Sequence, residues 1–147
     1  MDSNFFSMAK LHGANLASTS LVHANLVKAR LSKANLDHAT LQGAALIQAM
    51  ALRASFYEAD LRGVDFQGAD LRGAYLVHSN LESSVLRGAH LEGAVLHGAR
   101  LTGADLRGAT GVQAVQVSWI QLGHEGAPIR LEGEALHSWL AQAASVG

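Results

Sequence analysis

Large apolar residues recur at every fifth position along most of this chain. From Phe6 to Leu106, 20 of the 21 positions in this series are leucine or phenylalanine, and Ala51 is the exception. From Ala9 to Ala109, the positions two residues before a centre of this register are alanine in 17 of 21 cases, and the positions two residues after a centre, from Met8 to Gly108, are glycine in ten of 21. The register is never interrupted, so the pattern indicates an internal repeat of five residues.

Neither common secondary structure has this period. On an α-helix, which turns about 100° per residue, a step of five residues rotates the side chain by about 140° and spreads the leucines around the cylinder. In a straight β-strand, side chains alternate between faces, so successive centres point to opposite sides. The chain must therefore bend once in every repeat, and the glycines suit the positive φ of a type II turn. The pattern predicts a solenoid of stacked coils.

The repeat contains short motifs, which are ANL at 14–16, 24–26 and 34–36 and ADL at 59–61, 69–71 and 104–106. This pattern resembles the pentapeptide-repeat family, whose consensus is A(D/N)LXX, over about residues 4–110. The resemblance implies an all-β solenoid, a right-handed quadrilateral β-helix with four pentapeptides per coil. In this family the centre and the alanine before it point inward, and the other three positions face solvent. We therefore expect about five coils, which at about 4.8 Å per layer form a rod roughly 25 Å long.

The five-residue period stops after Ala109, and the rest of the chain has a different pattern. Residues 112–122 are rich in β-branched residues and predict a strand, 123–128 predict a turn, and 129–131 predict a short strand. Residues 134–144 predict a helix with one apolar face, which consists of Leu136, Trp139, Leu140 and Ala143.

We divide the chain into a repeat region, 1–110, and a C-terminal segment, 111–147, that has two interpretations. An open solenoid end exposes core leucines and unpaired backbone, so the segment is expected to cap the last coil. The resemblance to gyrase-protecting family members, some of which dimerise through C-terminal segments, implies in addition a homodimer. The candidate residues for capping or dimerisation are Trp119, Leu136, Trp139 and Leu140. The sequence leaves open whether they cover their own coil or contact a second chain.

Composition excludes several classes of function. Lys and Arg total 11 and Asp and Glu total 12 in 147 residues, so no net field attracts nucleic acid or a membrane surface. There are no cysteines, which excludes disulfides and thiolate metal sites. The N-terminus lacks the pattern of a signal peptide, and no apolar run approaches the roughly 20 residues that span a bilayer. We therefore expect a cytoplasmic protein.

Stacking at 20 residues per coil brings together outward side chains that are far apart in the sequence. It predicts exposed ion pairs between coils, in which Arg62 contacts Glu82 and Arg72 contacts Glu92. Such pairs would hold coils in register and carry no catalytic meaning.

Histidines in the same stacking suggest a metal hypothesis. His38, Glu58 and His78 form one column with a spacing of about 4.8 Å, and imidazole and carboxylate both ligate zinc. The column is exposed and supplies no fourth ligand, so we predict no metal and no cofactor. The glycines precede no helix and a filled solenoid offers no cleft, which predicts a protein that is not an enzyme and has no catalytic residues.

One predicted face carries apolar side chains at solvent-facing positions. Tyr57, Tyr75, Val77 and Val95 lie near each other across the third to fifth coils and form a candidate interaction surface. The alternative is that aromatic and β-branched residues simply favour strands. Ala51 raises a separate question, which is whether its neighbour turns inward there and makes a local bulge.

The resemblance implies a non-enzymatic protein-interaction function. The best-understood family members are quinolone-resistance proteins and self-resistance proteins of gyrase-poison producers. The implied partner is therefore DNA gyrase or topoisomerase IV, and the implied role is resistance to a topoisomerase inhibitor without direct binding to nucleic acid. Those members are described as acidic mimics of duplex DNA, whereas this chain has a net charge of −1 and arginines on several faces. The alternative function is a structural scaffold or adaptor with another partner.

Overall fold

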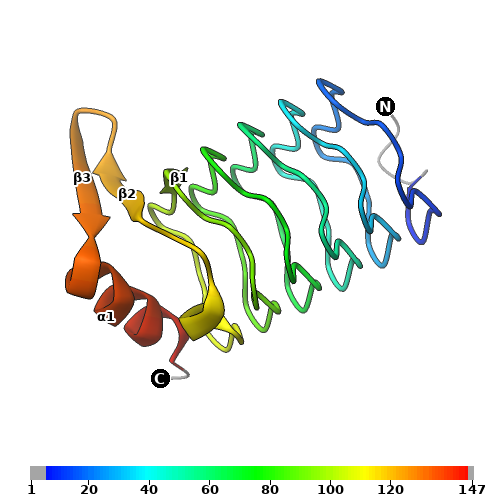
Figure 1. Cartoon of the computed structure of the whole chain (residues 1–147). Coiled ribbons are helices and arrows are strands. Elements are labelled where there is room, and N and C mark those ends of the chain that lie inside the picture. Colours follow the sequence, from blue (N-terminus) through cyan, green and yellow to red (C-terminus); the bar gives the residue numbers. More distant parts are fainter. Residues whose placement is uncertain (1–5, 146–147) are drawn as a thin grey trace.

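Parallel β-bridges join residues that are 20 positions apart along most of the chain. In the computed structural model, which describes residues 6–145, these bridges run in steps of five residues from Lys10↔Arg30 to His90↔Thr110. Each coil therefore contains four five-residue repeats, and successive coils stack along one axis (Figure 1). The predicted solenoid is confirmed, because only a chain that bends at every repeat can place each residue beside the one 20 positions later.

Each corner of the coil is a β-turn that is closed by the amide three residues after the centre. At a typical corner, the Ala14 amide donates to the Leu11 carbonyl over 3.0 Å. The residue two positions after the centre is left-handed at every described repeat, with φ of 65–75° at ten glycines and 51–60° at eleven other residues. The prediction of positive-φ turns is confirmed, but side chains also occupy these corners despite the strain of that conformation.

The centres and the alanines that precede them fill one continuous core. All the centres from Leu21 to Leu106 are buried. Where serine replaces the preceding alanine, at Ser79 and Ser84, the buried hydroxyl donates to a backbone carbonyl over 2.8 and 2.7 Å. The core therefore tolerates these polar atoms because each has a hydrogen-bond partner.

Ala51 occupies its centre without disturbing the ladder. It is fully buried, its amide donates to the Asp70 carbonyl over 2.8 Å, and Leu52 remains a half-exposed outward residue. The backbone here keeps the regular spacing and Leu52 does not turn inward. The same coil holds Phe56, whose buried ring lies 6.0 Å from that of Phe66 and supplies volume that Ala51 lacks.

The ladder continues past the end of the sequence repeat. Gln116 bridges Val95 as the next coil would, and a short 3₁₀ helix, η1 (Val112–Ala114), precedes it. The prediction of a strand over all of 112–122 is therefore wrong for its first part. The reason is that β-branched residues suit the extended segments of a solenoid coil as well as a regular strand.

A small three-stranded sheet closes the C-terminal end. Strand β2 (Trp119–His124) pairs in parallel with β1 (Ala99–Arg100) and antiparallel with β3 (Ala127–Glu132). The predicted turn shortens to the connection between β2 and β3, and the predicted short strand over 129–131 lies inside β3. The last coil thus passes directly into a β-hairpin that extends from the solenoid wall.

The helix α1 (Gly133–Ala144) lies across the end of the last coils (Figure 1). Leu136 and Leu140 are buried in the same apolar core as the repeat centres, and Trp139 and Ala143 pack against that core partly buried. The predicted helix and its apolar face are confirmed. Within the part of the chain that the structure describes, neither helix has the length and apolar character needed to cross a membrane.

The opposite end of the stack is less completely buried. The centres Phe6, Leu11 and Leu16 are only partly covered, and Leu21 is the first buried centre. The outer limits of the two predicted regions, 1–5 and 146–147, lie outside the described residues.

Candidate interaction surface

Three aspartate–arginine pairs share one geometry within single repeats, namely Asp60–Arg62, Asp70–Arg72 and Asp105–Arg107. In each pair Nε and Nη2 of the arginine donate to the two carboxylate oxygens over 2.6–2.9 Å. Both residues flank a centre on the outer side of an extended segment, so their side chains point the same way. The predicted pairing of Arg62 with Glu82 and of Arg72 with Glu92 is therefore wrong. Each planar guanidinium already matches the carboxylate beside it.

These pairs affect the titration of the aspartates. The hydrogen bonds from Arg107 lower the pKa of the Asp105 carboxyl to about 2. The equivalent hydrogen bonds in the other two pairs also lower the pKa of their aspartates. Each of these negative charges is covered by a positive charge in the same repeat, so they do not add up to an acidic stripe along the rod.

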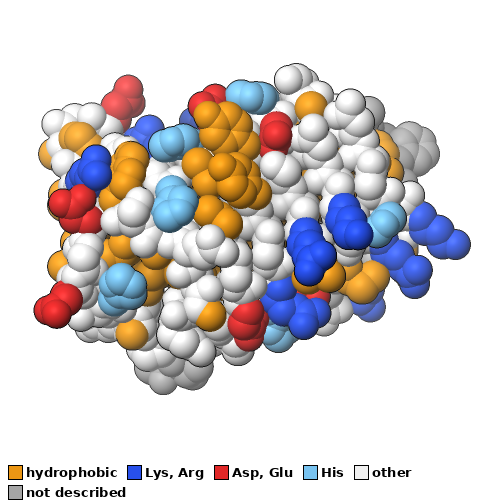
Figure 2. Space-filling view, in the orientation of Figure 1, with side chains coloured by type: hydrophobic (Ala, Val, Ile, Leu, Met, Phe, Trp, Pro, Cys, Tyr) orange, Lys and Arg blue, Asp and Glu red, His pale blue; other side chains and the backbone are white. Residues whose placement is uncertain are grey.

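On one side of the rod, outward rings from successive coils contact one another. The ring centroid of Tyr57 lies 5.6 Å from that of His38 and 6.2 Å from that of Tyr75. His78 lies 6.1 Å from Tyr57 and 6.1 Å from Trp119, again between ring centroids. These distances are normal for contacts between aromatic rings. We call these five residues the aromatic strip. Figure 2 shows orange side chains bordered by pale blue histidines on the face that is turned to the viewer.

Two of the predicted interaction residues belong to the aromatic strip, and the other two lie beside it. Tyr75 has 43% of its surface exposed, and Tyr57 is half-buried. Val95 is half-buried and bridges Tyr75 in the ladder. Val77 is only 7% exposed, so its assignment to an exposed surface is wrong. It stands between Tyr57 and His97 in its 20-residue column, where both neighbours are larger.

Sequence reasoning misses three members of the aromatic strip. It places His38 and His78 in a candidate metal column with Glu58, and it places Trp119 in the cap. In the structure, Oε2 of Glu58 lies 3.4 Å from Nδ1 of His38, and a side-chain hydrogen bond with Glu58 raises the pKa of Tyr57. Among residues 6–145, no group of three His, Cys, Asp or Glu side chains is arranged to hold a metal ion. The sequence signal that could have found these residues is the stacking itself, because the rings lie at outward positions of adjacent coils.

A glycine makes the C-terminal part of the aromatic strip continuous. Gly98 occupies the corner between His78 and Trp119, with φ of 68°. A Cβ atom there would lie 2.3 Å from Nδ1 of His78 and 3.0 Å from Cζ2 of Trp119. Because real Cβ contacts are not this short, any side chain at this corner would push the two rings apart.

The aromatic strip ends at the C-terminal hairpin. The guanidinium carbon of Arg130, on β3, lies 4.4 Å from the ring centroid of Trp119, on β2. This distance fits a cation–π contact, and Nε of Arg130 also donates to Glu132 over 3.0 Å. The last ring of the aromatic strip is therefore held from both sides, by the solenoid corner and by β3.

The repeat pattern decides the family of this chain. The family profile described as "Pentapeptide repeats" matches eight copies, over residues 9–46, 40–76 and 74–110. This chain belongs to the pentapeptide repeat family. Pentapeptide repeat proteins fold as right-handed quadrilateral β-helices, and the 20-residue ladder of this chain has four repeats per coil as that fold requires.

Solved structures of other pentapeptide repeat proteins resemble this one. Rfr23 from the cyanobacterium Cyanothece 51142 is 30% identical, and the match covers 72% of this chain and 85% of Rfr23 with a TM-score of 0.67. HetL from Nostoc sp. strain PCC 7120, involved in heterocyst differentiation regulation, is 32% identical over 78% of this chain and 66% of HetL, with a TM-score of 0.38. QnrB1, a plasmid-mediated fluoroquinolone resistance protein, is 19% identical over 80% of this chain and 76% of QnrB1, with a TM-score of 0.45. No curated protein matches this chain.

Proposed function

We propose that this pentapeptide repeat protein is a non-enzymatic interaction protein that binds a protein partner through the aromatic strip. The observation that carries the proposal is the unbroken contact of rings from His38 to Trp119, with 43% of the Tyr75 surface exposed. Aromatic side chains dominate the energetics of many interfaces because they bury a large area. The ladder fixes their backbones before binding, which lowers the entropic cost of association.

A type II topoisomerase, such as DNA gyrase or topoisomerase IV, is the partner to test first, as the family resemblance implies. Contact through the aromatic strip would differ from imitation of DNA. Asp60, Asp70 and Asp105 are each paired with an arginine of their own repeat, and the chain has a net charge of −1. A structural adaptor for another protein is the alternative, and the same surface supports it.

A homodimer through the C-terminal segment is also part of this proposal. Leu136 and Leu140 are buried in their own chain, so a contact between two chains would use the exposed outer side of α1, where Ala141 lies. Sedimentation equilibrium of the full chain and of Ala141→Arg tests this contact. A monomeric wild type at micromolar concentration would remove the dimer and leave the role of the aromatic strip unaffected.

Photo-crosslinking tests whether the aromatic strip contacts a partner. A benzophenone amino acid in place of Tyr75 is expected to capture one protein reproducibly in cells. The same amino acid in place of Gln67, which is exposed on another side of the same coil, is expected to capture none. Equal capture at the two positions, or no capture at position 75, contradicts the proposal.

A supercoiling assay tests the named partner. If the partner is DNA gyrase, the purified protein changes supercoiling or restores it in the presence of a quinolone. Tyr75→Glu is expected to remove that effect, because it places a charge within the ring contacts, and Gln67→Glu is expected to retain it. No effect of the wild type at micromolar concentration would exclude gyrase, and a protein captured at position 75 would then support the adaptor.

A further inference from the structure

A groove with a distinct composition lies on another side of the rod, toward the N-terminal end. It has a volume of about 410 Å³ and is lined by three cations, two methionines and a glutamine, namely Lys10, Lys28, Arg30, Met8, Met50 and Gln48. We call it the basic groove. Among the described residues, none of its three cations forms an ion pair with a carboxylate. This distinguishes the basic groove from Arg62, Arg72 and Arg107 farther along the rod, each of which is paired with an aspartate.

The edge of the basic groove consists of side chains at strained corners. Met8, Lys28 and Gln48 occupy successive left-handed corners with φ of 60°, 56° and 56°. The same column continues with Gly68 and Gly88, which adopt this conformation without strain. Glycine would serve the fold at all these corners at lower energy. At these three corners the side chains line the basic groove instead.

The methionines give the basic groove an apolar component beside its charges. Met8 is 68% exposed and Met50 is 41% exposed, which is high for large apolar residues. Met50 bridges Arg30 in the ladder, and Arg30 bridges Lys10, so two cations are followed by an apolar residue along one column at intervals of about 4.8 Å. Methionine side chains are flexible and polarisable, so they adapt to apolar side chains of different shape.

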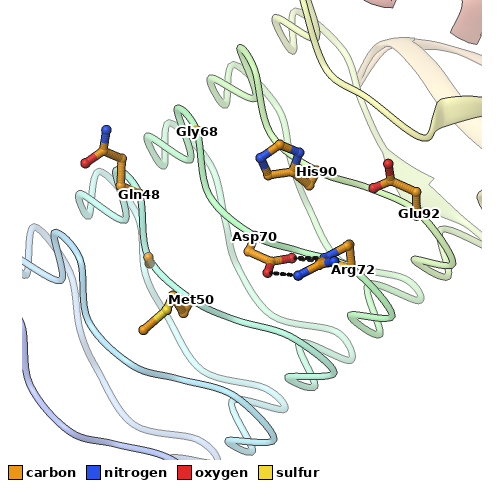
Figure 3. A pocket seen from close by; sticks show the side chains of 8 residues that line it. Gln48, Met50, Gly68, Asp70, Arg72, His90 and Glu92 are labelled. Atoms are coloured by element: carbon orange, nitrogen blue, oxygen red, sulfur yellow. Dashed lines mark hydrogen bonds and ion pairs between the residues drawn. The ribbon is translucent and has the colours of Figure 1, made fainter.

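The groove changes its charge farther along the rod. A second hollow of about 380 Å³ shares Gln48 and Met50 with the first and is otherwise lined by Asp70, Arg72, His90, Glu92 and small residues (Figure 3). There the Asp70 carboxylate is bound by Arg72. Figure 3 shows this pair below Gly68, which lines the hollow and has no side chain to fill it. The complete groove is thus basic at its N-terminal part and mixed in charge beyond Met50, which gives a bound chain a preferred direction.

We propose that the basic groove binds an extended acidic segment of another protein, with carboxylates on the cations and an apolar side chain on Met50. The distance from the level of Lys10 to that of Asp70 is three coil steps, or about 14 Å, which an extended peptide of about four residues spans. A single-stranded nucleic acid fits less well, because no aromatic ring lines the groove within the described residues to stack a base. The proposal is independent of the aromatic strip, which lies on a different side of the coils.

Fluorescence anisotropy with the full chain tests this proposal. The probe is a fluorescein-labelled peptide of sequence Glu-Glu-Leu-Glu-Glu-Leu, and the control peptide has glutamine in place of every glutamate. The acidic peptide is expected to bind with an affinity that falls as salt increases, and the control peptide is expected not to bind. A labelled single-stranded oligonucleotide of similar length is measured in parallel.

Two matched double variants separate the groove from general charge. Lys28→Glu with Arg30→Glu is expected to weaken peptide binding by at least about tenfold, because it reverses two charges in the groove. Lys33→Glu with Arg53→Glu makes the same charge change on the second and third coils but outside the groove, and binding is expected to remain within about twofold. Circular dichroism establishes that both variants are folded.

A third comparison tests the apolar contact. Met50→Ser is expected to weaken binding by about threefold to tenfold, whereas Met50→Leu is expected to retain it. Equal weakening by the two double variants would overturn the proposal, and so would tighter binding of the oligonucleotide than of the peptide. Concentration-dependent self-association that the acidic peptide displaces would also overturn it, because the groove would then hold a second copy of this chain.

Discussion

The two halves of the rod place different residues at their left-handed corners. From position 8 to position 58, only two of the eleven corner residues are glycine, whereas from 63 to 108 eight of the ten are. The N-terminal half ends in centres that are only partly buried, and the C-terminal half is covered by α1 and the hairpin (Figure 1). The first half therefore carries side chains at its corners and the second carries a cap at its end.

This difference separates corners where the fold alone explains the residue from corners where a surface explains it. A left-handed corner accepts glycine without strain, so a column of glycines such as Gly68 and Gly88 follows from the fold alone. Lys28 and His38 occupy equivalent corners despite that strain, and each belongs to a surface, the basic groove or the aromatic strip. Gly98 is the opposite case, because there a side chain is excluded by the rings that meet above the corner.

The largest expected effect contrasts the two ends. Leu140→Ala is expected to lower the free energy of unfolding by about 2–5 kcal/mol, because it leaves a cavity where α1 joins the apolar core. Leu16→Ala, at a partly exposed centre of the first coil, is expected to lower it by about 1 kcal/mol. Urea denaturation followed by circular dichroism measures both. Similar losses would mean that the two ends are equally well covered.

The next effect contrasts two glycine corners of the same half. Gly98→Ala is expected to destabilise the fold by about 2–4 kcal/mol, because the left-handed backbone strain adds to a collision with His78 and Trp119. Gly88→Ala has the same strain, but no described heavy atom lies within 4 Å of its added Cβ, so about 1 kcal/mol is expected. Tryptophan fluorescence is expected to change only in the first variant. An unchanged emission in Gly98→Ala would contradict the contact between His78 and Trp119.

The sequence predicts the solenoid well because its signal is repeated in every coil. The five-residue period identifies the inward centres and the positive-φ corners, and the apolar face of the C-terminal helix follows from its own spacing. Even at Ala51 the ladder keeps its register, since the hydrogen bonds of its neighbours on both sides define the position of the backbone. One atypical side chain does not outweigh that many regular contacts.

The surface is less predictable because it depends on competition between neighbours. The 20-residue stacking correctly places Glu82 near Arg62, but Asp60 of the same repeat binds the guanidinium. Glu82 pairs with Arg100 instead. Val77 occupies an outward position, yet it is buried because larger residues stand in the coils on either side. Only side-chain sizes and rotamers decide these outcomes, and a periodic pattern contains neither.

A smaller effect distinguishes strain from function at the side-chain corners. Lys28→Gly and Lys33→Gly are both expected to raise the free energy of unfolding by about 0.5–1 kcal/mol, because glycine relieves the left-handed strain at φ of 56° and 60°. Only Lys28→Gly is expected to weaken binding of the acidic peptide, because Lys33 lies outside the basic groove. Chemical denaturation and fluorescence anisotropy measure the two properties. Destabilisation by both substitutions would show that these lysines serve the fold itself.

The smallest expected effect concerns acid stability and the aspartate–arginine pairs that form within single repeats. Asp105 has a pKa of about 2 in the folded chain, below its ordinary value of 3.8, so the unfolded chain binds protons more readily than the folded chain. The resulting stabilisation is fully present above about pH 4 and is lost as the pH falls through about 2.

Arg107→Gln removes the arginine that pairs with Asp105, so the denaturation midpoint of this variant is expected to fall less than that of the wild type between pH 5 and pH 2. Arg53→Gln removes an arginine that pairs with no carboxylate among the described residues, and it is expected to leave the pH dependence unchanged. Because the Arg107 side chain is 54% exposed, the difference is expected to shrink further at high salt. A difference that persists in molar salt would indicate a structural role for Arg107 beyond its charge.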